Sequence, residues 1–77
     1  MGKRVRLTAE FTHKAMKDDQ LLIADLLENR FKVSPFFVRA SSNLVHVEYV
    51  DPYDYSSFLQ QHIEGYSDVK KVTVRPA

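Results

Sequence analysis

The stretch from residue 36 to residue 50, FFVRASSNLVHVEYV, decides the fold. Residues 36–40 are rich in aromatic and β-branched side chains, which favours a strand, and Pro35 in front of them suits a strand at the edge of a sheet. Residues 41–43 are polar and typical of a turn. Residues 44–50 then alternate between apolar and polar side chains, which is the period of a strand buried on one side. We therefore expect a β-hairpin in the middle of the chain.

An amphipathic segment lies on each side of this hairpin. Residues 13–30 carry apolar side chains at three- and four-residue spacing, which predicts a helix capped by Thr12, or one that starts later and is capped by Asp18. After the hairpin, Asp51 and the proline that follows it are typical of a helix start. Gly65 is expected to end this second helix in a left-handed conformation.

Alternating segments at the two ends complete the pattern. Residues 3–11 and 69–75 both read as strands, so the predicted order is strand, helix, strand, strand, helix, strand in a single domain over residues 1–77. This order resembles the ferredoxin-like α+β fold, in which two helices cover one face of a four-stranded antiparallel sheet and the first and third strands are central. Many functions share that fold, so the resemblance does not identify one.

The composition excludes several classes of protein. The 77 residues contain no cysteine, which excludes a disulfide framework and a thiolate metal site. A net charge of +1 is far from the strongly basic balance typical of nucleic-acid-binding proteins. No apolar run is long enough to cross a bilayer, and the first residues lack the apolar stretch of a secretory signal. We expect a cytoplasmic protein that does not bind membranes.

The sequence carries no catalytic or metal-binding motif. Its three histidines lack the spacing of a helical zinc pair, and its two glycines form no phosphate-binding loop. Acylphosphatases share the topology, but they need a glycine-rich loop with an arginine after the first strand, where this chain has Thr12, His13 and Lys14. We therefore expect no enzymatic activity, no metal and no cofactor.

One sheet face is predicted to be uncovered and basic. RNA-recognition modules of similar topology bind on this face, but they stack bases on aromatic side chains of the central strands, and here those positions hold arginine, threonine, histidine and glutamate. Glu10 and Glu48 would repel phosphate, and a cross-strand ion pair of Arg6 with Glu48 is an alternative explanation of the charges. Nucleic-acid binding therefore stays open as the alternative function. Its phosphate contacts would come from Arg4, Arg6, Arg39, Lys71 and Arg75.

A second candidate surface combines acids and tyrosines around the second helix start, EYVDPYDY at residues 48–55. Tyrosine is enriched at protein interfaces, so this stretch favours contact with a basic partner protein. The alternative is structural, since two of the tyrosines fit the core pattern and two of the acids suit a helix cap. The interface residues that we predict here are Glu48, Asp51, Tyr53 and Asp54.

Phe37 adds a third surface. Phe36 and Phe37 cannot both be buried by alternation, and Phe37 is expected to project from the uncovered face of an edge strand, where it would support a homodimer or a partner contact. Taken together, the residues predict a non-enzymatic binding or regulatory protein. We expect an adaptor or inhibitor of a larger protein, of the kind that viruses and mobile elements encode.

Overall fold

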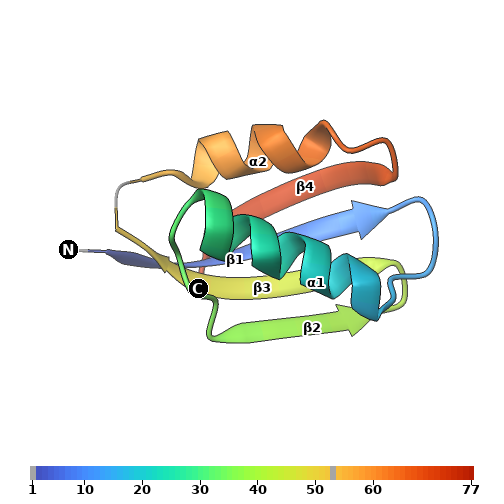
Figure 1. Ribbon diagram of the computed structural model, residues 1–77, viewed down its shortest axis with the longest axis horizontal. Coiled ribbons are helices and arrows are strands. Elements are labelled where there is room, and N and C mark those ends of the chain that lie inside the picture. Colours follow the sequence, from blue (N-terminus) through green and yellow to red (C-terminus); the bar gives the residue numbers. More distant parts are fainter. Residues whose placement is uncertain (1, 53) are drawn as a thin grey trace.

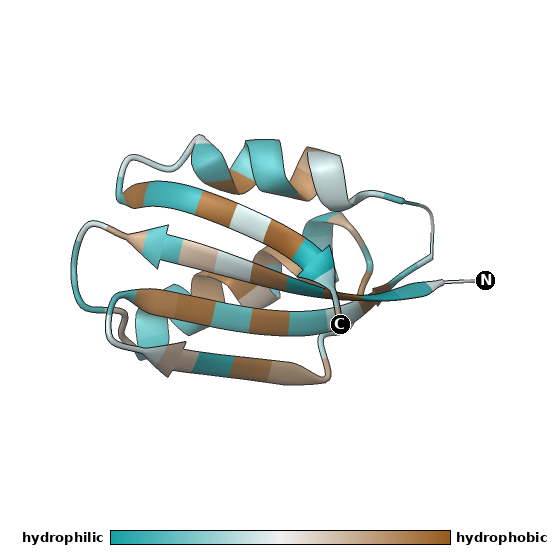
Figure 2. Ribbon diagram, turned by 180° about the vertical axis from the view of Figure 1, so that it is seen from behind, coloured by the Kyte–Doolittle hydropathy of each residue, from teal (hydrophilic) through white to brown (hydrophobic). Residues whose placement is uncertain are grey.

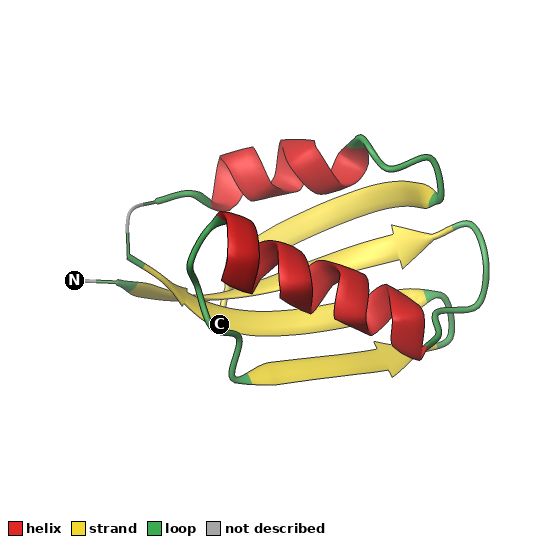
Figure 3. Ribbon diagram, in the orientation of Figure 1, coloured by secondary structure: helices red, strands yellow, loops and turns green. Residues whose placement is uncertain are grey.

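Four strands form one antiparallel sheet in the order β2-β3-β1-β4, and two helices lie on one of its faces (Figures 1 and 3). The computed structural model describes residues 2–52 and 54–77. The predicted element order and the central position of the first and third strands are confirmed. The elements are β1 (Lys3–Phe11), α1 (Lys17–Asp25), a π-helical turn η1 (Leu26–Arg30), β2 (Phe37–Ser41), β3 (Leu44–Asp51), α2 (Ser56–Glu64) and β4 (Val69–Pro76).

The core lies between the sheet and the helices. Along β1, every second side chain is buried, because a strand covered on one face turns alternate residues toward the core. β3 contributes a matching set, and Ile23, Leu27, Leu59 and Ile63 cover them from the helices. The fully buried side chains of the two central strands are Leu7, Ala9, Phe11, Val45, Val47 and Tyr49.

Helix α1 begins later than its preferred prediction. The prediction of a start at residue 13, capped by Thr12, is wrong because backbone bonds hold this segment elsewhere: Thr12 N donates to Asp68 O at 2.9 Å, and Ala15 N donates to Ser42 O at 2.8 Å. The alternative of a later start is confirmed, but the cap is not Asp18. Asp19 Oδ2 accepts a hydrogen bond of 2.8 Å from the backbone N of Met16.

The start of α2 also differs from the prediction. Asp51 was expected to be the cap residue with the proline in the first turn, but it pairs with Lys3 as the last residue of β3, and α2 begins only at Ser56. Its carboxylate still caps the helix from this distance. Oδ1 accepts from Tyr55 N and Oδ2 from Ser56 N, both at 2.9 Å.

Two backbone conformations complete the fold. Gly65 lies in the right-handed region, with φ −74°, so its predicted left-handed conformation is wrong. The helix ends in a tight turn instead, where Gly65 N donates to His62 O at 3.2 Å and Tyr66 N to Ile63 O at 3.0 Å. The predicted hairpin is confirmed, and Ser42 supplies the positive φ of its turn, 56°.

Candidate functional site

Hydrophilic and hydrophobic residues alternate along the strands (Figure 2), and the register aligns the polar ones of neighbouring strands in rows on the uncovered face of the sheet. The register places Phe37, Glu48 and Arg6 in one row across β2, β3 and β1, and Arg75 of β4 pairs with Arg6. Cross-strand partners share a face, so all five basic side chains that the sequence assigned to this face lie on it. The next row holds, in the same strand order, Arg39, His46, Thr8 and Thr73.

Glu48 forms ion pairs with two arginines on this face. Arg6 Nε donates to Glu48 Oε2 at 2.9 Å and its Nη2 donates to the same oxygen, while Arg4 Nη2 lies 3.8 Å from Oε1. The predicted pair of Arg6 with Glu48 is therefore confirmed. Each guanidinium also lies over a ring, Arg4 at 4.9 Å from the centroid of Phe36 and Arg6 at 5.9 Å from that of Phe37. Phe37 is therefore half-buried beneath the Arg6 guanidinium, and its predicted role in a partner contact stays a prediction.

His46 lies in the centre of the face and makes a polar contact with β1. Its Nδ1 is 3.0 Å from Thr8 Oγ1. Partial burial, and then the positive charges of Arg6 and Arg39, lower the pKa of His46 below its ordinary value, because each disfavours the imidazolium. His46 is therefore neutral at pH 7, and its ring can donate or accept in the contact with Thr8.

This depressed pKa predicts a pH dependence of stability. In the unfolded chain the pKa of His46 is 6.5 and in the folded protein it is lower, so the unfolded state binds more protons as the pH falls through 6.5. Stability is then lost on acidification. We expect His46→Gln to lose less free energy of unfolding than the wild type between about pH 7.5 and pH 5.5 in urea titrations. An equal loss in both proteins would contradict the assigned role of His46.

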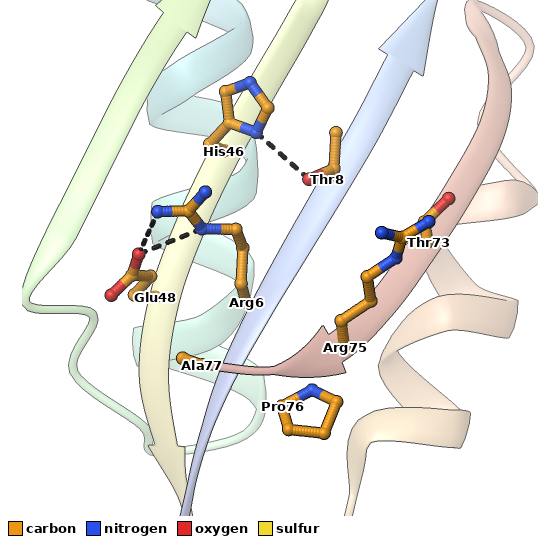
Figure 4. Close-up of a pocket in the computed structure, with 8 residues that line it drawn as sticks. All are labelled: Arg6, Thr8, His46, Glu48, Thr73, Arg75, Pro76 and Ala77. Atoms are coloured by element: carbon orange, nitrogen blue, oxygen red, sulfur yellow. Dashed lines mark hydrogen bonds and ion pairs between the residues drawn. The ribbon is translucent and has the colours of Figure 1, made fainter.

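A cavity of about 570 Å³ opens on this face beside β4. In Figure 4 the side chain of Arg75 runs back along β4 toward Thr73, while Arg6 turns the other way, toward Glu48. No carboxylate of the described residues lies within ion-pair distance of Arg75. The cavity is lined by Arg6, Thr8, His46, Glu48, Thr73, Arg75, Pro76 and Ala77.

The described residues of the acidic, tyrosine-rich stretch, 48–52, 54 and 55, do not form one surface. Asp51 is 5% exposed, and its carboxylate accepts hydrogen bonds from Tyr55 N and Ser56 N. A partner protein would therefore find little of this side chain to contact. Glu48 is held by arginines on the sheet face. Asp54 is exposed beside the helix start, in a left-handed conformation with φ 61°. Tyr53 lies outside the described residues.

Instead, partly buried aromatic side chains gather beside α2 at the edge of the core, a surface that the sequence reasoning did not single out. Tyr55 contacts Phe58 and Phe31 with ring centroids 6.4 and 6.1 Å apart, and His62 contacts Phe31 and Tyr66 at 6.5 and 5.7 Å. We call these five residues the aromatic row. Phe58, at one end of the row, is 62% exposed. The shared face of α2 was visible in its spacing, but the contribution of Phe31 from the end of η1 was not.

The expected absence of a metal, the expected absence of membrane binding and the possible homodimer all remain predictions. Among residues 2–52 and 54–77, no three histidine, aspartate or glutamate side chains lie close enough together to hold a metal ion, and no helix is long and apolar enough to cross a membrane. β2 is an edge strand, as predicted, but nothing in the structure tests a homodimer on it.

Comparison with solved structures shows which known fold the chain has. The chain has a ferredoxin-like α+β fold, with four antiparallel strands and two helices. It is similar to the P2 domain of the chemotaxis kinase CheA, solved in complex with the response regulator CheY from Thermotoga maritima. The TM-score is 0.72 at 13% identity, and the match covers 100% of both chains. The sequence matches no protein-family model and no curated protein. At this identity, the similarity shows the fold alone.

Proposed function

We propose that this chain is a non-enzymatic protein-interaction domain that acts as an adaptor or inhibitor of a larger protein. The observation that carries the proposal is the aromatic row. Its rings pack on one another, yet Phe58 stays 62% exposed. A protein surface gains little by exposing a large ring, whereas a partner that covers it removes apolar area from water.

The geometry of the row suits an interface. The rings hold one another in place, so a partner would not have to order flexible side chains, and a rigid contact surface lowers the entropic cost of binding. Tyr55 and Tyr66 add hydroxyl groups beside the apolar surface, a combination enriched where proteins meet. Asp54 precedes the row and is exposed, which fits a partner with a basic rim.

The similarity to the P2 domain supports the same proposal. That domain was solved bound to a response regulator, so a fold of this size and topology can serve as a docking module for another protein. We carry over only this general role. The identity of the partner and the surface that the P2 domain uses are not transferred.

Phe58→Ala tests the proposal. Because Phe58 is exposed on a helix, alanine should leave folding intact, whereas the loss of the most exposed ring of the row should weaken partner binding about thirtyfold or more. Phe36→Ala is the matched control, since Phe36 is also an exposed phenylalanine, at 51%, and lies beside Arg4 at the sheet.

The measurement is affinity capture from host lysate by tagged wild-type, Phe58→Ala and Phe36→Ala domains, run with and without nuclease. We expect a defined protein that wild-type and Phe36→Ala recover and that Phe58→Ala does not. Equal recovery by all three domains would contradict the placement of the interface, and recovery that nuclease removes would favour the nucleic-acid alternative.

A further inference from the structure

We propose that the cavity on the open sheet face binds a phosphoryl group, held chiefly by the guanidinium of Arg75, with Arg6 at the opposite wall, and hydrogen-bonded by Thr8 and Thr73. This site is separate from the aromatic row and goes beyond the proposed protein interaction. Its ligand class is a phosphate ester. A small phosphorylated molecule and the backbone of a nucleic-acid strand both present this group.

The register of β1 and β4 brings the four residues of the proposed site close together. Arg6 pairs directly with Arg75 across β1 and β4, and two residues along each strand Thr8 pairs directly with Thr73. Cross-strand partners lie about 5 Å apart at Cβ, and second neighbours along a strand about 7 Å apart. All four side chains line the cavity, where Arg75 runs along β4 toward Thr73 and the guanidinium of Arg6 is turned toward Glu48 (Figure 4).

The charges at this site are unbalanced. Like charges directly opposite each other on adjacent strands are unfavourable, and Arg6 and Arg75 form such a pair. Glu48 offsets Arg6 from the side away from β4, and no carboxylate of the described residues pairs with Arg75. An anion in the cavity would balance the charge of Arg75 and reduce its repulsion of Arg6, and the arginine fork matches the oxygen geometry of phosphate.

The polar neighbours also fit an anion. When Nδ1 of His46 carries the ring proton, it donates to Thr8 Oγ1 and leaves the hydroxyl hydrogen free to donate into the cavity. Partial burial, and then the charges of Arg6 and Arg39, lower the pKa of His46, so a bound anion that offsets these charges would raise it. That rise is a readout of binding that a change elsewhere on the surface would not produce.

Arg75→Gln tests the proposal. The variant removes the unpaired guanidinium from an exposed position on an edge strand, so folding should be unaffected, and phosphate affinity should fall about tenfold or more. Arg30→Gln is the matched control, because it removes the same charge from η1 on the helix side of the molecule.

The measurement is an NMR titration of ¹⁵N-labelled protein with inorganic phosphate, a nucleoside monophosphate and a short single-stranded oligonucleotide, each at constant ionic strength against chloride. We expect saturable shifts at Thr8, His46, Thr73 and Arg75, together with a raised pKa of His46, in the wild type and Arg30→Gln but not in Arg75→Gln.

The three ligands separate the sources of the phosphoryl group. Saturation by the monophosphate points to a small ligand, and saturation by the oligonucleotide alone points to a strand. Shifts no larger than those with chloride for every ligand, or equal affinities for Arg75→Gln and Arg30→Gln, would overturn the site. Neither result bears on the aromatic row, which Phe58→Ala tests independently.

Discussion

Leu7→Ala is expected to lower the free energy of unfolding by about 3–5 kcal/mol, at the upper part of the range for buried leucines. Leu7 is 0% exposed in the middle of β1, and this central strand pairs with β3 on one side and β4 on the other. The cavity left by the deleted atoms cannot close easily, because two neighbouring strands hold the backbone in place. A small domain has only about 5–15 kcal/mol of stability, so a large part of it would be lost.

Urea unfolding followed by circular dichroism measures this loss. Leu21→Ala is the matched control, since Leu21 is 49% exposed on α1 and its truncation should change stability by no more than about 0.5 kcal/mol. If Leu7→Ala cost as little as Leu21→Ala, the central position of β1 in the core would be wrong.

Asp51→Asn should be the second most destabilising change, by about 2–4 kcal/mol. The buried carboxylate accepts hydrogen bonds from Tyr55 N and Ser56 N at 2.9 Å and from Ser56 Oγ at 2.6 Å, so it caps α2 and ties that helix to the end of β3. Asparagine keeps one acceptor oxygen and turns an NH₂ group toward backbone donors, which leaves buried polar groups without partners.

Asp54→Asn provides the comparison for this change. Asp54 is exposed and has a positive φ of 61°, a conformation that asparagine also tolerates, so the same chemical change should cost less than about 0.5 kcal/mol. Thermal unfolding of both variants at neutral pH separates the two carboxylates. Similar melting temperatures would mean that Asp51 does not cap the helix.

The fold could be predicted because its local signals agree with one another. The alternation in residues 3–11 and 44–50 predicted the buried side of each central strand. The apolar spacing of residues 55–66 predicted one shared face of α2, on which Leu59 and Ile63 are buried but Phe58 is 62% exposed. These patterns depend only on which side chains avoid water. Together with the central hairpin, these patterns give the order strand, helix, strand, strand, helix, strand. This order resembles that of the ferredoxin-like fold.

The helix starts were predicted less well because caps depend on contacts distant in sequence. Thr12 has the right side chain for a cap, but its backbone N–H is bonded to Asp68. Asp51 does cap α2, yet it does so from the end of a strand, a geometry that the order of residues alone does not reveal.

The candidate surfaces were also predicted less well where they depend on contacts between residues distant in sequence. The basic face followed from alternation, and the pair of Arg6 with Glu48 could be named in advance because antiparallel register is regular. The aromatic row could not be, since Phe31 reaches Tyr55 and His62 only when the end of η1 packs beside α2. Tyr49 is buried at 0% exposure, so an abundance of tyrosines in sequence did not by itself define a surface.

The most direct test of the proposed function is an NMR map of the bound partner. ¹⁵N-labelled domain would be titrated with the protein that it captures, and the perturbed amides would be placed on the structure. We expect the largest perturbations at Phe31, Tyr55, Phe58, His62 and Tyr66, with the open sheet face unchanged. Perturbations centred on Arg6, His46 and Arg75 instead would contradict the account and assign partner binding to the opposite face of the domain.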